Sequence, residues 1–468
     1  MSLSPQAPPP LRRLNSLHLK RESLSAFRVL LMETSVHRIA KISRRRDGCK
    51  PFETTLARLG LLILLHLGLS ASWAAAEPLS ESQVIGLFYA RNLSLISAEF
   101  GLETAQAQKV IAAAIPNPEL NLYSQELAPN YPISSNGPVI YVSVSQLIET
   151  AGKRRLRMEN SLLGEQAAES DLRDAIRILT QAVRRAYYDL LLAQETMDAT
   201  QEQSRHVQRL VEVQKKRFDV GDISERDLTR IKIEALKAQS DIDKNSAQIV
   251  SARSQLAVFL AWPENTASMS VKDQWPEGKA FDGLKDEVSA MNAAMERRPD
   301  LLAARTRYTQ AKHGVDLAKA QRIPDVKITA GFAHDLGNYV QNGATLGLSV
   351  PLPLFYRQEG EIAQAGIRSN DAELRVRQTE VAVRSEVSTA FAAWISANTI
   401  VKRFETEVMQ KATHIRDSAE IAYTSGSTDI LDLIQAQRDY RNTILDYYQA
   451  QANRAYAYVD LKMAIGEE

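Results

Sequence analysis

The segment RFDVGDISERDL, which runs from Arg217 to Leu228, recurs as AYTSGSTDILDL from Ala422 to Leu433, at an offset of 205 residues. Two further pairs repeat at an offset of 206 residues: ARNLSLISAE (90–99) with ERRPDLLAAR (296–305), and PELNL (118–122) with PDVKI (324–328). Chance similarity between helical stretches would not preserve the order of the elements, and here the order is preserved. The repetition therefore predicts two halves of about 185 residues that follow one plan.

Each half contains a long stretch without helix breakers. No glycine lies between Gly164 and Gly221 or between Gly366 and Gly426, and proline is absent from both intervals. Apolar residues step by four and three in alternation: Leu172, Ile176, Leu179, Val183, Ala186 and Leu190 in the first half, and Val383, Val387, Ala390, Trp394, Ala397 and Val401 in the second. This is the 3.5-residue period of helices packed as a left-handed coiled coil. A helix over residues 150–218 would be on the order of 100 Å long, more than a compact globule needs.

Gly221 and Gly426 lie where the two long helices are expected to end, since a glycine in the left-handed conformation commonly closes a helix. The chain is predicted to turn back there, so that each half contains an antiparallel helical hairpin. The returning helix of the first half, over residues 225–260, is shorter than its partner. A helix over residues 80–114 could supply the missing length if the two were stacked end to end.

The tips of both hairpins are polar and acidic. Ser224 in the first half and Ser427 or Thr428 in the second are possible N-caps of the returning helices. Asp429 and Asp432 follow at the start of the second returning helix, and two interpretations of them stay open. They could compensate the helix dipole, or they could form an acidic ring that favours cations if several copies surround a pore.

Four short segments have the two-residue period of β-strands, with apolar and polar residues in alternation. They lie at PELNL (118–122), IYVSVS (140–145), VKITAGF (326–332) and TLGLSV (345–350). Connections rich in Asn, Gly and Pro predict two hairpins. The apolar face could cover a soluble core, or it could face lipid in an outer-membrane barrel whose polar face points inward. Four strands cannot close such a barrel, for which about eight is the small end, so the second interpretation requires an oligomer.

The first 76 residues differ from the rest in charge and pattern. They hold 12 of the chain's 57 Lys and Arg and 4 of its 56 Asp and Glu, which leaves 45 basic and 52 acidic side chains. The apolar run LGLLILLHLGL (59–69) follows a basic stretch and precedes SASWAAA (70–76), so we expect a signal peptide cut after Ala76. The remaining net charge of about −7 does not favour nucleic-acid binding. The single cysteine, Cys49, excludes an internal disulfide.

Residues 77–468 contain no arrangement typical of an active site. Their four histidines, His206, His313, His334 and His414, are far apart in the sequence, and no cysteine accompanies them, so no zinc-like cluster is visible. Neither a glycine-rich phosphate loop nor a GxSxG motif is present. We therefore expect neither an enzyme nor a resident cofactor or metal ion.

Several motifs together resemble the TolC superfamily of outer-membrane efflux proteins. They are the element around Asn92, the strand entry PNPEL (116–120), SQLIETAGKRRLRMENS (145–161) and the turn RFDVGDIS (217–224), within two similar halves behind a signal peptide. PNPEL followed by QLIETAGKRR is most similar to the outer-membrane channels of heavy-metal tripartite exporters of the cobalt-zinc-cadmium type. The chain departs from the family pattern at Leu93, where proline is usual, and at Ala151, where glycine is usual.

The resemblance implies a fold that is mainly α with β. Long coiled-coil hairpins would form a periplasmic α-barrel, and four strands from each of three copies would form a transmembrane β-barrel. The corresponding divisions are a leader and signal peptide over 1–76, a first repeat over 77–265, an equatorial linker over 266–284 and a second repeat over 285–468. The resemblance also implies a homotrimer in the outer membrane that works with a periplasmic adaptor and an inner-membrane RND pump. The residues expected at the tip turns and at adaptor docking are Gly221, Asp222, Ser224, Gly426 and Ser427.

Passive conduction of exported substrate, with heavy-metal cations as the first expectation, is the function that the resemblance implies. Export of drugs or proteins stays open, because the pump can determine the cargo of such a tunnel. A secreted coiled-coil scaffold would also explain the heptads, although it leaves the alternating strands without a use.

Overall fold

The computed structural model describes residues 78–125, 138–262, 266–272, 275–277, 281, 286–336 and 342–467. These residues belong to one compact unit, Ala75–Glu468. The leader and signal peptide expected over 1–76, the connections within both predicted β-hairpins and part of the linker expected over 266–284 lie outside the described residues.

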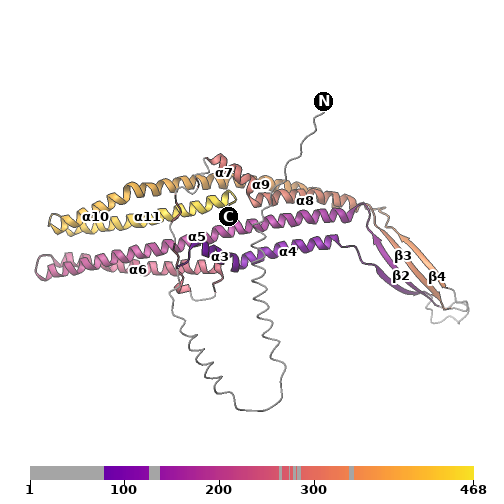
Figure 1. The fold of residues 1–468 in the computed structure, drawn as a ribbon, viewed down its shortest axis with the longest axis horizontal. Coiled ribbons are helices and arrows are strands. Elements are labelled where there is room, and N and C mark those ends of the chain that lie inside the picture. Colours follow the sequence, from indigo (N-terminus) through magenta and orange to yellow (C-terminus); the bar gives the residue numbers. More distant parts are fainter. Residues whose placement is uncertain are drawn as a thin grey trace, which may run out of the picture. The chain divides into compact units, whose positions relative to one another are not determined.

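The first half follows the predicted order of elements (Figure 1). It consists of helices α3 (Glu81–Arg91) and α4 (Leu93–Ala113), strands β1 (Glu119–Gln125) and β2 (Val139–Ile148), and helices α5 (Lys153–Asp219) and α6 (Glu225–Leu260). Helix α5 contains 67 residues, so the very long helix that the sequence predicts is confirmed.

The second half repeats this plan. After the short 3₁₀ turn η1 (Thr266–Ser268) come α7 (Glu287–Arg297), α8 (Pro299–Gln321), β3 (Val326–Asp335), β4 (Asn342–Ser349), α9 (Glu359–Arg403), η2 (Phe404–Val408), α10 (Met409–Thr424) and α11 (Ile430–Ala464). The sequence predicts one continuous long helix here, and the structure differs, because η2 is a π-helical turn between α9 and α10. A π turn adds a residue to the helical register. Turn η2 begins at Phe404, three residues after Val401, which is the last residue of the predicted apolar ladder.

Both predicted apolar ladders face the interior. In the second half all six ladder residues, from Val383 to Val401, are buried, and the first five belong to one apolar cluster. In the first half Val183, Ala186 and Leu190 are buried, and the three ladder residues before them pack against the same cluster. Burial of a Val or Leu side chain contributes about 1.5–3 kcal/mol, so packing along the ladders stabilises these helices more than helix propensity does.

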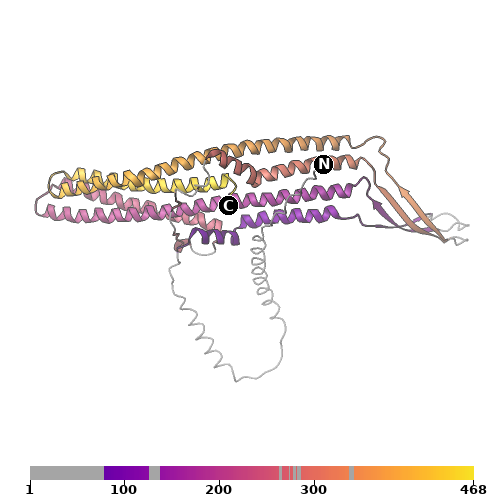
Figure 2. The same cartoon turned by 45° about the horizontal axis from the view of Figure 1, so that its top comes forward.

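The helices lie side by side in the order α4, α5, α8 and α9 (Figures 1 and 2). Toward its C-terminal end α5 packs against α6 and α11, and α11 also contacts α9 and α10. Helix α3 contacts α6 as well as α5, and Asn92 Nδ2, at the break between α3 and α4, donates to Phe259 O at 2.8 Å. The two short helices therefore supply the length that α6 lacks, as the sequence predicts.

The four strands form one antiparallel sheet in the order β1-β2-β3-β4. The pairing of β2 with β3 joins the two halves of the chain, and β1–β2 and β3–β4 are the two predicted hairpin pairs. The strands lie in the same order as the helices that they continue. Strand β1 continues α4, β2 is continued by α5, β3 continues α8, and β4 is continued by α9.

The segment between the halves is fixed to α5 by aromatic residues. Trp262 and Trp275 pack against the main apolar cluster, and the Trp275 ring stacks on Tyr188 with 6.0 Å between ring centroids. Tyr187 Oη donates to Lys272 O at 2.6 Å. Within the described ranges, none of the helices combines the length and the apolar character that crossing a membrane requires.

Candidate functional site

The sheet has one apolar and one polar face. Directly opposed residues of antiparallel strands share a face, so the register forms one row of Leu122, Val142, Phe332 and Ala344 across the apolar side. Most large side chains of this face are exposed, and Leu346 reaches 87% exposure. The alternation that the sequence predicts is therefore confirmed, and the apolar face does not cover a core of the described chain.

The polar face is crowded. Ser143 and Ser145 are 8% and 1% exposed, and Asn121 Nδ2 donates to Ser145 Oγ at 3.2 Å. At Gly331 an added Cβ would lie 2.5 Å from Ser143 Cβ and 2.7 Å from Val142 O, so a side chain does not fit there.

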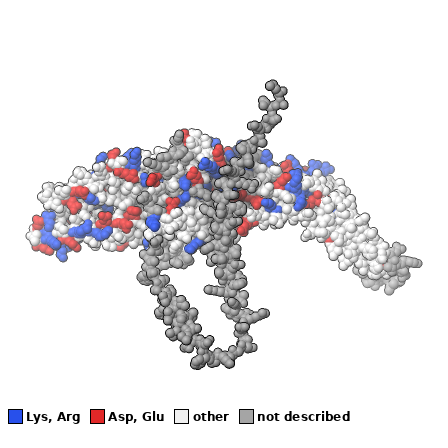
Figure 3. All heavy atoms as spheres, in the orientation of Figure 1, with Lys and Arg blue, Asp and Glu red and all other residues white. Residues whose placement is uncertain are grey.

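Charge separates the sheet from the helices. Figure 3 shows Lys, Arg, Asp and Glu mixed over the helices and almost none over the strands. The charged residues within the described strands are Glu119, Lys327 and Asp335, all at or near strand ends. An exposed apolar face without charge is the pattern of a surface that contacts lipid.

The basic run after β2 anchors the sheet to the helices. The Lys153 side chain is 8% exposed, and its Nζ lies 2.7 Å from Asp325 Oδ1, which also accepts a hydrogen bond from Thr150 N at 2.9 Å. Burial by itself would raise the pKa of Asp325, but the hydrogen bonds from Lys153 and Thr150 hold it below its ordinary value. Arg157 bonds both carboxylate oxygens of Glu149. These cations are committed to structural partners.

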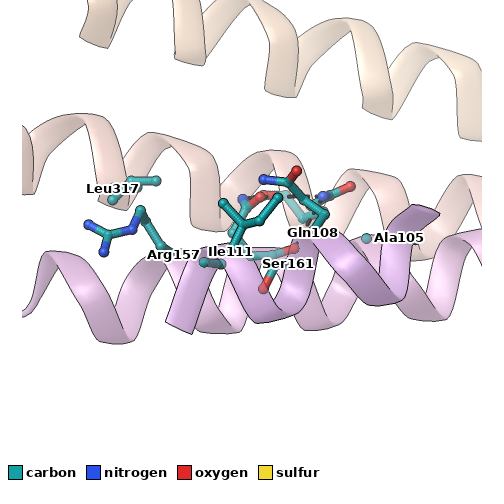
Figure 4. Close-up of a pocket in the computed structure, with 10 residues that line it drawn as sticks. Ala105, Gln108, Ile111, Arg157, Ser161 and Leu317 are labelled. Atoms are coloured by element: carbon teal, nitrogen blue, oxygen red, sulfur yellow. Dashed lines mark hydrogen bonds between the residues drawn. The ribbon is translucent and has the colours of Figure 1, made fainter. Parts of the chain in front are cut away.

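A cavity of about 360 Å³ lies where α4, α5 and α8 meet (Figure 4). Its lining is mostly polar or small and includes Gln108, Ser161, Asn160 and Gln310. Asn160 Nδ2 donates to Gln310 O at 2.9 Å, and Gln310 Nε2 donates to Asn160 O at 3.1 Å. Gly164 permits this close contact, because a Cβ there would lie 2.8 Å from Gln310 Nε2. The cavity reflects helix packing, and its lining contains no pair of an acid and a base for catalysis.

The two tip turns have the same backbone conformation. Gly221 has φ +77° and Gly426 has φ +75°, the left-handed region that the sequence predicts for both. In each turn the residue after the glycine, Asp222 or Ser427, donates its N–H at 2.8 Å to a carbonyl five residues earlier. The repeat therefore extends to the hydrogen bonds that close the helices.

The helix caps agree with the sequence in one half only. Ser224 is the N-cap of α6, as predicted, and its Oγ accepts from Asp227 N at 3.2 Å. In the second half the prediction of Ser427 or Thr428 is wrong, because Asp429 caps α11 and accepts from the N–H of Ile430. An offset of 205 from Ser224 leads to position 429, so the duplication contained the signal that identifies this cap.

The predicted site acids have different surroundings. Asp222 Oδ2 lies 2.5 Å from Arg217 Nε, so its charge is paired next to the turn. The Asp429 carboxylate serves as a cap, whereas Asp432 is exposed in the first turn of α11. The geometry thus explains Asp222 and Asp429 locally, and it brings neither of them together with Asp432 in a ligand cluster.

A contact between the two hairpins near their tips was not predicted. Arg217 Nη1 donates to Tyr423 Oη at 2.7 Å, and the guanidinium carbon lies 5.3 Å from the Tyr423 ring centre. Tyr423 Oη in turn donates to Gln214 Oε1 at 2.8 Å. The hydrogen bond with Asp222 raises the pKa of Arg217, so this link keeps its charge. The only sequence signal was that Tyr423 occupies the position equivalent to Phe218.

The histidines remain apart in the fold. His206 is half-buried with its Nε2 3.0 Å from Gln437 Nε2, and burial lowers its pKa. His313 Nδ1 lies 3.9 Å from Glu159, and His334 Nδ1 lies 2.6 Å from Asn342 Oδ1. Among the residues that the structure describes, no three His, Cys, Asp or Glu side chains are arranged to hold a metal ion.

Long helical hairpins that continue into a sheet with charges only near its strand ends and an exposed, uncharged apolar face define a channel-forming protein of the outer membrane. The family model described as outer membrane efflux protein matches residues 84–261 and 290–467, one match in each half. The chain belongs to this family. It is an outer-membrane efflux channel with a periplasmic helical part, and it is not an enzyme, as the resemblance to the TolC superfamily implies.

Named relatives agree with this assignment. The cobalt-zinc-cadmium resistance protein CzcC of Cupriavidus metallidurans is 22% identical over 366 residues, which are 78% of this chain and 84% of that protein. The pyoverdine export outer membrane protein OpmQ of Pseudomonas putida is 22% identical over 418 residues, covering 84% of this chain and 87% of OpmQ. The crystal structure of the outer membrane protein VceC from Vibrio cholerae has a TM-score of 0.67 at 19% identity and covers 83% of this chain and 96% of that chain. The predicted fold class is confirmed.

Proposed function

We propose that three copies of this chain form one channel, with twelve strands in the membrane and the helices as a periplasmic tunnel. The observation that carries this proposal is the pair of open edges of the sheet. In the described sheet β1 and β4 each pair on one side only, and unpaired backbone groups in lipid cost several kcal/mol each. Pairing β4 of one copy with β1 of the next satisfies one edge of each, and closing the ring satisfies every edge. Closure after three copies exceeds the minimum of about eight strands.

The helices next to these edges support the same arrangement. On α4, Leu93 and Phe100 are exposed seven residues apart, and on α9, Ile367, Leu374 and Val381 are exposed at intervals of seven. Seven-residue spacing is the pattern of helices that pack on a partner helix. Since α4 leads into β1 and α9 follows β4, the copy that pairs the strands would also cover these apolar stripes.

The oligomer is tested by extraction and native mass measurement. We expect recovery from membranes only with detergent, as a trimer, and recovery of a soluble periplasmic monomer would overturn the proposal. Leu374→Asp introduces a charge into the α9 stripe and should abolish the trimer. Leu374→Met, which keeps an apolar side chain of similar volume, is the matched control and should leave the trimer intact.

We infer that the exported cargo is heavy-metal cations. The resemblance of PNPEL and QLIETAGKRR to metal exporters supports this inference, as does the relative named for cobalt-zinc-cadmium resistance. The relative named for pyoverdine export makes an organic cargo the second candidate. Deletion of the gene should lower tolerance to cobalt, zinc and cadmium, and complementation should restore it. Unchanged metal tolerance together with reduced export of an organic compound would favour the second candidate.

We further propose that the tip turns meet a periplasmic adaptor that connects the channel to an inner-membrane RND pump. The residues of this docking surface are Gly221, Asp222, Ser224, Gly426 and Ser427. All five are exposed in the isolated chain, which supports the proposal. Crosslinking from cysteines introduced at Asp222 and Ser427 should capture the adaptor, and absence of capture from both positions would contradict docking at the tips.

Asp429 and Asp432 are proposed as an acidic gate at the periplasmic opening. Three copies would bring six such carboxylates around one axis, and rings of Asp favour cations. Changing both to Asn removes the charges while an Asn at position 429 can still cap the helix. Single-channel recordings should then report reduced cation selectivity. Glu225→Gln at the other tip is the control, and unchanged selectivity in the double variant would leave both aspartates as helix-start acids.

A further inference from the structure

We propose that Tyr123 and Tyr141 form an aromatic constriction on the lumen side of the sheet, which hinders bulky organic solutes and admits hydrated metal ions. The inference rests on the trimeric channel proposed above and adds a filter to it. The two tyrosines are direct partners in the β1–β2 register. Their rings stack with centroids 4.6 Å apart and planes inclined by 6°.

Both rings belong to the polar face of the sheet. Tyr123 lies two positions from Asn121 and Tyr141 lies two positions from Ser143, and residues two apart on a strand share a face. In an outer-membrane barrel the apolar face contacts lipid and the polar face lines the interior. The aromatic girdles of such barrels lie on the lipid side, so a girdle does not account for this pair.

The tyrosine pair is the bulkiest feature of the polar face. The register continues its row from Tyr141 to Ala333 and then to Gly343. The next row toward the helices holds Asn121, Ser143, Gly331 and Thr345, which are all smaller than tyrosine. In the described strands, no other Phe, Tyr or Trp lies on this face. Each copy therefore contributes a block of two rings beside a gap formed by Ala333 and Gly343.

This arrangement separates solutes by size more than by charge. Tyr123 is 53% exposed, so its ring extends into open space where three copies would surround the axis. Faces of tyrosine rings attract cations, which keeps the barrier low for small metal ions. A bulky organic solute must displace the stacked rings to pass. The constriction would thus oppose entry of large molecules from outside while metal ions leave.

The test is single-channel recording of Tyr123→Ala/Tyr141→Ala in planar bilayers. We expect the conductance in potassium chloride to rise on the order of 1.5-fold, because loss of two rings per copy widens the lumen at this row. The permeability of tetraethylammonium relative to potassium should also rise. Leu122→Ala/Val142→Ala is the matched control, because these residues are direct partners on the same two strands and lie on the opposite face. Its conductance and permeability should equal those of the wild type.

The other outcomes separate this inference from the proposed channel. Tyr123→Phe/Tyr141→Phe keeps the ring size and should keep wild-type conductance. A trimeric alanine variant with unchanged conductance and tetraethylammonium permeability would overturn the constriction and leave the channel intact, whereas a wild-type protein that conducts nothing would overturn the channel itself. If the double alanine variant does not assemble, the single changes Tyr123→Ser and Tyr141→Ser decide the matter by the same two readouts, each with a smaller rise.

Discussion

The two halves of the chain make the same contact with different chemistry where their first helices break. In the first half Asn92 caps α4, and its Nδ2 donates to Phe259 O at 2.8 Å. At the equivalent position of the second half, Arg298 donates from Nη1 to Ala464 O at 3.4 Å. Arg298 lies 206 residues after Asn92, and Ala464 lies 205 residues after Phe259, so donor and acceptor occupy equivalent positions in the two halves. Duplication therefore preserved the contact while the donor side chain changed from a neutral amide to a cation.

The difference shows what a charge adds at such a break. Asn92 is satisfied by backbone groups, since its Oδ1 also accepts from Leu95 N at 2.8 Å. Arg298 is 2% exposed and bonds Asp300 at 2.6 Å and Glu386 at 2.5 Å, which joins α8 to α9. Burial by itself would raise the pKa of Asp300, but the hydrogen bond with Arg298 holds it below its ordinary value. The second half is therefore held at its break by an ionic cluster that has no counterpart at Asn92 among the described residues.

The largest effect should come from Arg298→Met. Loss of the guanidinium leaves Asp300 and Glu386 without their shared partner, and breaking a buried ion pair costs about 3–5 kcal/mol. The Glu386 side chain is 46% exposed, so we expect a loss near the lower limit, roughly 3 kcal/mol. The measurement is the free energy of unfolding by denaturant of the detergent-solubilised protein.

Asn92→Ala is the matched change in the first half. It removes a cap and a hydrogen bond between neutral groups, for which we expect a loss of about 1–2 kcal/mol. An equal or larger loss at Asn92 than at Arg298 would contradict the view that the ionic cluster carries more of the stability at these breaks.

The next effect concerns an ion pair between the halves. The Glu234 side chain is 8% exposed on α6 and bonds Arg438 of α11 through both carboxylate oxygens. The hydrogen bond with Arg438 lowers the pKa of Glu234. Its stabilising contribution is therefore complete above the unfolded-state pKa of about 4.3 and is lost as the pH falls through the lower folded-state pKa. We expect this contribution to be on the order of 1–3 kcal/mol.

Glu234→Gln tests this assignment through the pH profile of unfolding. The variant should be less stable than the wild type at pH 7 and should lose less stability on acidification. Asp439 is the equivalent residue of the second half and is exposed, so Asp439→Asn should leave the acid limb of the profile as it is. Parallel acid limbs for the wild type and Glu234→Gln would rule out the buried pair as a source of pH dependence.

The tip glycines should respond equally because their conformations are equal. An added Cβ at Gly221 or Gly426 would meet nothing within 4 Å, so the cost of Val at either position is conformational, about 1–2 kcal/mol. Both variants should retain membrane insertion and lose adaptor crosslinking. Gly101→Ala, in a helix with open space around it, is the control and should not lose stability. Unequal losses at the two tips would break the equivalence of the halves.

Local patterns were sufficient for most of the fold. The bounds of α6 agree with the predicted range of 225–260, and the strands and turns lie where period-two alternation and the two glycines indicated. These features depend on neighbours in the sequence, so one chain reveals them. The duplication gave a second source of prediction, because each helix, strand or turn expected in one half is also expected at the equivalent position of the other half.

Features that depend on distant partners were not predictable. Arg298 and Glu386 are separated by 88 residues, and Glu234 and Arg438 by 204 residues, so no local pattern marks either pair. The π turn η2 contains neither Gly nor Pro and looks like ordinary helix in the sequence. The cap at Asp429 was missed for a different reason, since the offset of the repeat identified it and nearer hydroxyl residues were preferred.

The smallest effect concerns the two caps, and it separates capping from gating. Replacing Ser224 or Asp429 with Ala should cost about 1 kcal/mol in each half, because both residues serve as N-caps. Exchanging the two residues, with Ser224→Asp and Asp429→Ser, should be close to neutral for stability, since Ser and Asp cap helices about equally well. The exchange nevertheless moves one carboxylate per copy from the second tip to the first. If Asp429 acts only as a cap, single-channel recordings of the exchange variant will keep the wild-type cation selectivity. If its charge belongs to the gate, selectivity will fall although the unfolding free energy does not, and that result would distinguish the two tips by function where their backbones are alike.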